Sequence, residues 1–192
     1  MPSTRYAARL AIAQYFGGTT WQSQTTPNVG ALIEGPLQSQ GLSAVYPRWA
    51  KRLPDENFFL FGNLQSTARG MGTIMVVHIP KLGERRIALN ANSTGHVTNS
   101  GTKQDDAQVE LHLYHLAQVD YAEEAEADLE TMIDSIYDYI EQDVMLGGAC
   151  IGAGENKYGI QSVMNIPVSE QGTERVEQYA KISFQCQFFF IA

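Results

Sequence analysis

Four histidines, His78, His96, His112 and His115, are the side chains best suited to chemistry in this sequence. Only His112 and His115 lie close together, in a segment whose alternating pattern predicts a strand. Residues three apart on a strand point to opposite faces, so without a bulge one metal ion cannot bind both rings. We therefore predict no metal site, and we expect the histidines to be exposed or hydrogen-bonded.

Two cysteines and one glycine-rich segment are the next candidates. Cys150 and Cys186 stand 36 positions apart with no CxxC spacing, which provides neither a zinc framework nor a dithiol redox motif. Two free thiols are expected, with one disulfide as the alternative. Residues 152–155 (GAGE) resemble a phosphate loop only superficially, because they follow a predicted helix and lack the third glycine. No cofactor is predicted.

Carboxylates are concentrated in one part of the chain. Residues 1–103 contain 10 of the 13 lysines and arginines, whereas residues 104–156 contain 14 of the 21 acidic residues and no lysine or arginine. Catalytic carboxylates need distinct environments that separate their pKa values, so this acidic block favours a solvated face. Duplex binding depends on cations at phosphates. The block therefore argues against a surface that grips nucleic acid, and leaves open a face past which DNA slides.

The elements that must position these groups follow from hydrophobic periodicity. Helices are expected at 4–16 and 121–146, and strands at 42–46, 73–79, 85–89, around 109–113, 158–164 and 176–191. Pro80 is expected to end one strand, with residues 81–83 turning a hairpin into the next. The order predicts a single domain over 1–192 of the α+β class: a largely antiparallel sheet with two helices packed on one face and long polar loops. No stretch is apolar enough for a membrane span.

Two elements have the clearest patterns. The helix at 121–146 carries an apolar stripe with helical spacing, and we predict that it is buried against the sheet while the intervening acids face water. The stripe consists of Leu129, Met132, Ile133, Ile136 and Ile140, with Val144 continuing the spacing. The strand at 176–191 is so apolar that it should lie centrally in the sheet.

The order of elements, with several short motifs, resembles the tail-terminator family of long-tailed bacteriophages, especially the versions found in phages of actinobacteria. The motifs are Tyr15-Phe16, Val45-Tyr46, the Phe58–Gly62 run, Val77-His78-Ile79, Glu84-Arg85-Arg86-Ile87-Ala88-Leu89, Leu129, Ile133-Asp134, Leu146-Gly147, Gly154-Glu155 and Tyr158-Gly159-Ile160. The likeness covers most of residues 3–190.

The resemblance implies a virion protein without catalytic activity. It would form a sixfold ring on the last ring of the tail tube protein, stop tube polymerisation and present a surface to the head-side connector protein. DNA would pass through without specific binding, and assembly would take place in the host cytoplasm with no membrane involved. A neighbouring neck or tail-completion protein is one alternative. A small cytosolic enzyme using His112 or His115 with a nearby carboxylate is another.

Ring formation needs two different complementary surfaces on each subunit. The basic pair Arg85 and Arg86 on one subunit could face acids such as Glu123 and Glu126 of the acidic block on the next. The polar segments 17–57 and 90–106 suit contacts with partners, because long loops are rarely kept without use. The candidate docking residues are Asn92, His96, Asn99 and Lys103.

Overall fold

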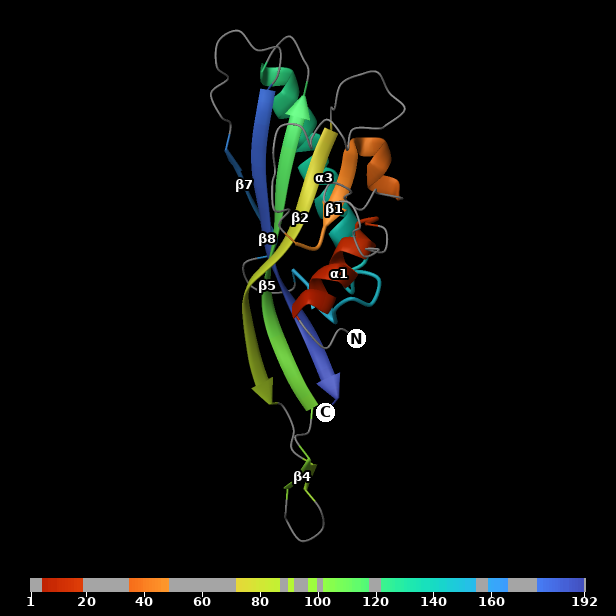
Figure 1. Ribbon diagram of the computed structural model, residues 1–192, viewed down its shortest axis with the longest axis vertical. Coiled ribbons are helices and arrows are strands. Elements are labelled where there is room, and N and C mark those ends of the chain that lie inside the picture. Colours follow the sequence, from red (N-terminus) through yellow and green to blue (C-terminus); the bar gives the residue numbers. More distant parts are fainter. Residues whose placement is uncertain are drawn as a thin grey trace, which may run out of the picture.

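The computed structural model describes residues 5–18, 35–48, 72–86, 90–91, 97–99, 102–117, 122–154, 159–165 and 176–191. Its elements are α1 (Arg5–Tyr15), the 3-10 helix η1 (Pro36–Gln40), β1 (Leu42–Tyr46), β2 (Gly72–Arg86), β3 (Asn90–Ala91), β4 (Val97–Asn99), β5 (Thr102–Ala117), α3 (Ala122–Gln142), β6 (Gly152–Ala153), β7 (Gln161–Asn165) and β8 (Val176–Ile191). The predicted α+β class is confirmed: α1 and α3 pack on a mostly antiparallel, curled six-stranded sheet (Figure 1).

The sheet runs in the order β1-β2-β5-β8-β6, and β7 also pairs with β8. β1 and β2 are parallel, whereas the other pairs of this sheet are antiparallel. β8 forms backbone pairs on both of its edges, with β5 on one side and with β6 and β7 on the other. The predicted internal position of this apolar strand is therefore confirmed.

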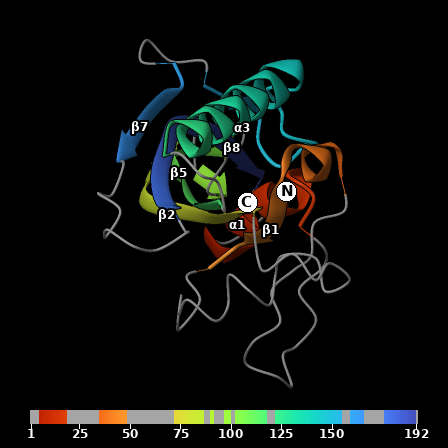
Figure 2. The same cartoon turned by 90° about the horizontal axis from the view of Figure 1, so that it is seen from above.

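Both helices lie against one face of the curled sheet, which we call the helix face (Figure 2). Side chains alternate along each strand between this face and the opposite one, which we call the outer face. On β5, Val109, Leu111 and Leu113 point to the helix face and are fully buried with the apolar residues of both helices. The predicted alternation on this strand and the placement of both helices on one face are therefore confirmed.

The apolar stripe of α3 lies in this core. Its members are buried, as predicted: Leu129, Met132, Ile133, Ile136 and Ile140. Most of the described acids of α3 are exposed: Glu124, Asp128, Glu130, Asp134, Asp138 and Glu141. The helix ends at Gln142 and not at residue 146, and Val144 is half-buried beyond its end. The helix stops here because of Asp143. Its carboxylate accepts hydrogen bonds from the backbone N–H groups of Met145 (3.0 Å) and Gly147 (2.8 Å), which in a continued helix would donate to backbone carbonyls.

β2 is longer than the sequence predicts. Pro80 does not end the strand and residues 81–83 do not turn a hairpin, because β2 continues to Arg86. The ladder with β5 shifts register between His78 and Lys81, so the proline sits at a bulge. β1 pairs with β2 only over residues 73–76, and a proline is tolerated where a strand has no ladder partner on one side.

The true hairpin joins β2 to β5. Its ladder reaches the pair Arg86 and Lys103, and the predicted loop 90–106 is partly strand: residues 90–91 pair with 97–99, and β5 begins at Thr102. Of the predicted loop 17–57, the structure describes residues 17–18 and 35–48, which include η1 and β1; the Phe58–Gly62 run lies outside the described residues.

Three smaller expectations concern the segment after α3. Cys150 and Cys186 are both free and buried, as expected, and burial raises the pKa of the Cys186 thiol. Residues 152–153 of the GAGE segment form β6, which pairs with β8, and Glu155 lies outside the described residues. The predicted strand 158–164 is shifted to β7.

No helix in the described part of the chain has the length and apolarity to span a membrane.

Candidate functional site: a histidine–glutamate cluster on the outer face

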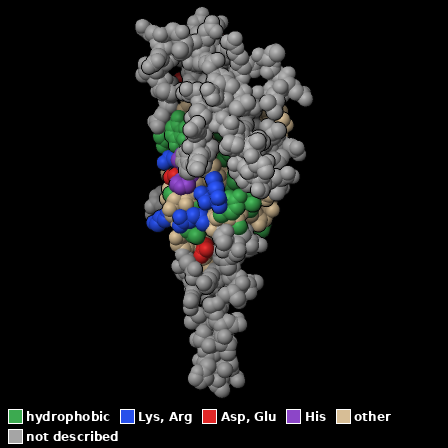
Figure 3. Space-filling view, viewed as in Figure 1, with side chains coloured by type: hydrophobic (Ala, Val, Ile, Leu, Met, Phe, Trp, Pro, Cys, Tyr) green, Lys and Arg blue, Asp and Glu red, His purple; other side chains and the backbone are tan. Residues whose placement is uncertain are grey.

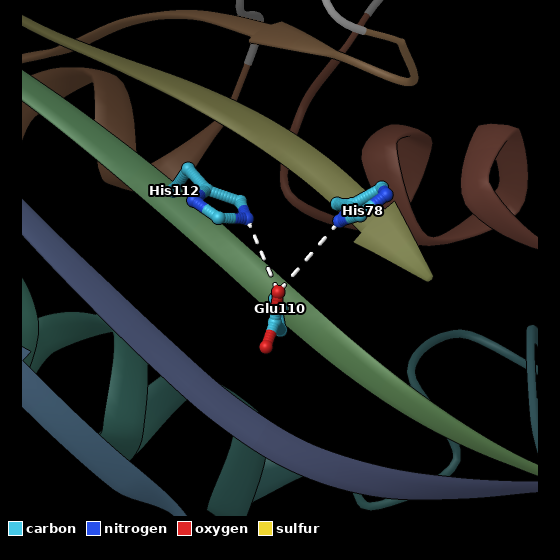
Figure 4. Close-up of side chains that lie close together, drawn as sticks. All are labelled: His78, Glu110 and His112. Carbon is cyan, nitrogen blue, oxygen red and sulfur yellow. Dashed lines mark ion pairs between the residues drawn. The ribbon is translucent and has the colours of Figure 1, made fainter. Parts of the chain in front are cut away.

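Two histidines and a glutamate meet on the outer face of β2 and β5. His78 on β2 is the direct ladder partner of Glu110 on β5. His112 follows Glu110 by two positions and therefore projects from the same face. The strand pairing thus brings together two imidazole rings from parts of the chain more than 30 residues apart (Figure 4).

One oxygen of the glutamate faces both rings. Glu110 Oε2 lies 3.6 Å from His78 Nδ1 and 3.4 Å from His112 Nε2. The other oxygen, Oε1, lies 3.5 Å from Nζ of Lys181 on β8. The side chain of Glu110 is 14% exposed and that of His112 is 10% exposed, so this carboxylate is largely withdrawn from water and held by three neighbours.

The second nitrogen of His112 is also held. Its Nδ1 lies 2.6 Å from the hydroxyl of Tyr179 on β8. Burial lowers the pKa of His112, and the nearby Glu110 carboxylate partly opposes that shift. The ring is therefore favoured in its neutral form, with Nδ1 engaged by a hydroxyl and Nε2 turned toward a carboxylate.

The cluster is accessible from one side of the molecule. His78 is its most exposed member, with a side chain 30% exposed. Figure 3 shows histidine atoms beside acidic and basic ones, midway along the visible face. Among the described residues, this is the one group of three histidine, cysteine or acidic side chains whose potential ligand atoms converge, all within 4.8 Å of one another.

A second polar group crosses the helix face below the start of α3. Thr73, His115 and Gln178 occupy neighbouring positions on β2, β5 and β8, and all three are buried. Thr73 Oγ1 and His115 Nδ1 lie 2.9 Å apart. In the amide orientation that satisfies both of its groups, Gln178 donates to the carbonyl of Ala125 at 2.8 Å and accepts from the backbone N–H of Glu126 at 3.2 Å. The row therefore anchors the first turns of α3.

His115 should make the stability of the fold depend on pH. Burial lowers its pKa, partly opposed by Asp128 on α3. The unfolded chain takes up a proton near pH 6.5, whereas the folded chain takes it up only at lower pH. The stability that the fold gains by burying neutral His115 is therefore complete above about pH 6.5. It is lost as the pH falls through that value toward the lowered pKa of the folded chain.

When the pH is lowered from about 7.5 to about 5.5, we expect the free energy of unfolding to fall less in His115→Gln than in the unmodified chain. Urea denaturation at both pH values measures the two losses. Glutamine keeps a polar partner for Thr73 and does not titrate. His96→Gln is the matched control and should retain the original pH dependence. An equal loss in the His115 variant would contradict the assignment.

The residues predicted as sites from the sequence are separated by the fold. Arg85 and Arg86 end β2, and Lys103 is the second residue of β5, at the same end of the long strands; Asn99 lies in β4 beyond them. Asn92 and His96 lie outside the described residues. Glu123 and Glu126 occupy the first turns of α3, at the other end of the sheet (Figure 1). Two surfaces so placed cannot meet within one chain.

The expected opposition of His112 and His115 holds, because they lie on opposite faces of β5. The sequence did not predict that His78, from β2, joins Glu110 and His112 in one cluster. The alternation along β5 puts Glu110 and His112 on one face, and this signal is present in the sequence. The register between β2 and β5, which sets His78 opposite Glu110, is not. Described grooves lie between α1 and residues 146–149 and between α3 and residues 153–154 and 159–160, and neither is lined by His112 or His115.

The sequence matches no protein-family model and no curated protein.

Proposed function

We propose that this chain is a virion structural protein that forms a ring at the end of a phage tail tube. The ring stops tube polymerisation and joins the tube to the head-side connector protein. DNA passes through it without specific binding. The proposal starts from the sequence resemblance to tail terminators and is supported by the shape and charge of the described fold.

The observation that carries it is the length of the three central strands. β2, β5 and β8 contain 15 to 16 residues each, which corresponds to roughly 50 Å of extended chain. Their ends project past α1 and α3 as a three-stranded arm (Figure 1). An arm of this kind offers a contact surface away from the core, as a protein that must engage several partners requires.

The arm also has open backbone edges in the described part of the chain. β1 stops pairing with β2 at Val76, and β6 reaches no further along β8 than Gln187. Beyond these positions, each outer strand of the arm pairs on one side only among the described residues. An exposed strand edge is a template for a strand or loop from another chain. A ring former can use one edge on each subunit for its neighbour.

Charge supports the same assembly. The exposed acids of α3 present a surface that repels phosphates, as a channel past which DNA slides requires. The basic pair at the end of β2 and the acidic start of α3 lie at opposite ends of the molecule. Pairing between them therefore joins different copies. It requires each subunit's long axis to be inclined to the ring axis, so that one end of a subunit meets the opposite end of its neighbour.

Native mass spectrometry of the purified chain tests the proposal. We expect a closed ring for the unmodified protein and a shift to smaller species for the double variant Arg85→Glu, Arg86→Glu. Raised salt should also weaken the unmodified ring, because exposed charge pairs are screened within about 10 Å at 0.1 M salt. Lys81→Glu is a matched control: it reverses a charge on the same strand, before the end of the arm, and should leave the ring intact.

A ring of unchanged mass in the double variant would remove Arg85 and Arg86 from the subunit interface. A purified chain that remains monomeric at all concentrations, and that does not assemble on tail tubes viewed by electron microscopy, would contradict the proposed function itself.

A further inference from the structure

We propose that His78, Glu110 and His112 bind one divalent transition-metal ion of the zinc class. The proposal goes beyond the proposed function and concerns the purified chain alone. Three side chains from two strands direct their ligand atoms to a common point, with both histidine nitrogens facing the same carboxylate oxygen (Figure 4).

The distances suit a tetrahedral ion. Bonds of about 2.0–2.1 Å to nitrogen and oxygen place tetrahedral ligand atoms roughly 3.3–3.4 Å apart. The two histidine-to-glutamate distances are 3.6 and 3.4 Å, close to that spacing. The three ligand atoms lie within 4.8 Å of one another, and His78, the most exposed of the three residues, has room for the small rotation that closes the set.

The surrounding groups orient the ligands. A histidine that binds metal through one nitrogen usually holds its other nitrogen in a hydrogen bond, which fixes the tautomer and the ring. His112 has this arrangement, because Nδ1 contacts the Tyr179 hydroxyl at 2.6 Å while Nε2 faces Glu110. Lys181 contacts Oε1 of Glu110 and so leaves Oε2 toward the imidazoles.

The donor set selects the class of ion. Two imidazoles and one carboxylate suit zinc and its neighbours, whereas magnesium and calcium prefer oxygen ligands throughout. Three protein ligands leave one coordination position for water or for a donor from another molecule. The ion would join β2 to β5 beside the Pro80 bulge, where the arm begins, and would fix the register of the two strands.

The experiment uses the untagged chain of 192 residues after treatment with a chelator, and Zn²⁺ alone as the probe. Calorimetric titration is expected to show one ion bound per chain. At a free Zn²⁺ concentration 100-fold above its dissociation constant, the melting temperature should rise by roughly 5–10 °C and return when a chelator is added. Co²⁺ in place of Zn²⁺ should give the visible absorption of a tetrahedral site, and Mg²⁺ should give no shift.

Variants assign the binding to the cluster. His78→Ala and His112→Ala should each abolish saturable binding. Tyr179→Phe keeps all three ligands and should weaken binding by roughly 10–100-fold, the usual effect of losing an outer-shell hydrogen bond. His96→Gln removes a histidine that is not one of the three proposed ligands and should bind Zn²⁺ as the unmodified chain does. If His112→Ala fails to fold by circular dichroism, His78→Ala and Tyr179→Phe decide the question.

Two results would overturn the proposal. One is the absence of saturable Zn²⁺ binding to the unmodified chain. The other is binding that persists with the same affinity in folded His78→Ala, which would place the ion elsewhere and leave the cluster as an ion-pair and hydrogen-bond network. Neither result depends on whether the chain forms rings, so this test is separate from that of the proposed function.

Discussion

Replacing Ile136 with alanine is expected to lower the free energy of unfolding by about 2–5 kcal/mol. Ile136 is fully buried in the middle of the α3 stripe, within the core that joins both helices to the sheet. The loss combines the transfer of the removed methyl groups with the cavity that remains, because a packed core relaxes only in part. Urea denaturation monitored by circular dichroism measures it.

Asp134→Ala is the matched control on the same helix. Asp134 is exposed, and a surface change of this kind usually alters stability by no more than about 0.5 kcal/mol. The contrast between two positions two residues apart tests which face of α3 is buried. A loss below about 0.5 kcal/mol for Ile136→Ala would contradict the packing of this helix.

The elements with strong periodicity could be predicted from the sequence. The stripe of α3, from Leu129 to Ile140, repeats with helical spacing over about three turns, and its burial follows from that repeat alone. β8 has the predicted bounds, Val176–Ile191, because its apolar length fits only a strand paired on both sides. In these cases the local pattern and the tertiary packing favour the same structure.

The hairpin could not be predicted, because its position depends on which strands lie next to β2. A proline ends a strand only where its missing N–H would have been needed in a ladder. At Pro80 no β1 residue pairs with β2, so the strand continues through a bulge for six more residues. The sequence around Pro80 contains no information about where β1 stops.

The cluster was missed as a direct consequence. A turn at residues 81–83 would have paired the 73–79 strand with the residues that follow it, and His78 would not have met β5. The observed hairpin sets His78 opposite Glu110, and that pairing creates the three-residue group. The alternation along β5 predicts the faces of Glu110 and His112 correctly, whereas the geometry of the site depends on the register between β2 and β5.

Removing the tip of the arm should separate folding from assembly. Arg86 and Lys103 are direct ladder partners, so residues 87–102 can be replaced by a two-residue Asn-Gly turn that joins them. This shortens the connection from 16 residues to two, which changes the loop-closure free energy by about 2 kcal/mol in the stabilising direction. The variant should therefore fold and resist urea at least as well as the unmodified chain.

Assembly should nevertheless fail in the shortened variant. The deletion removes Asn92, His96 and Asn99, three of the four residues proposed to dock on partners, and keeps Lys103 together with the core of α1, α3 and the sheet. Phage production supported only by this variant should yield overlong or headless tails in electron micrographs. A variant that keeps the tip and replaces Asn92 and Asn99 with serine preserves the length of the arm and tests the side chains alone. Normal tails joined to heads in the shortened variant would show that the tip is not the docking surface, and would leave the open edges of β2 and β8 as the candidate contact surfaces.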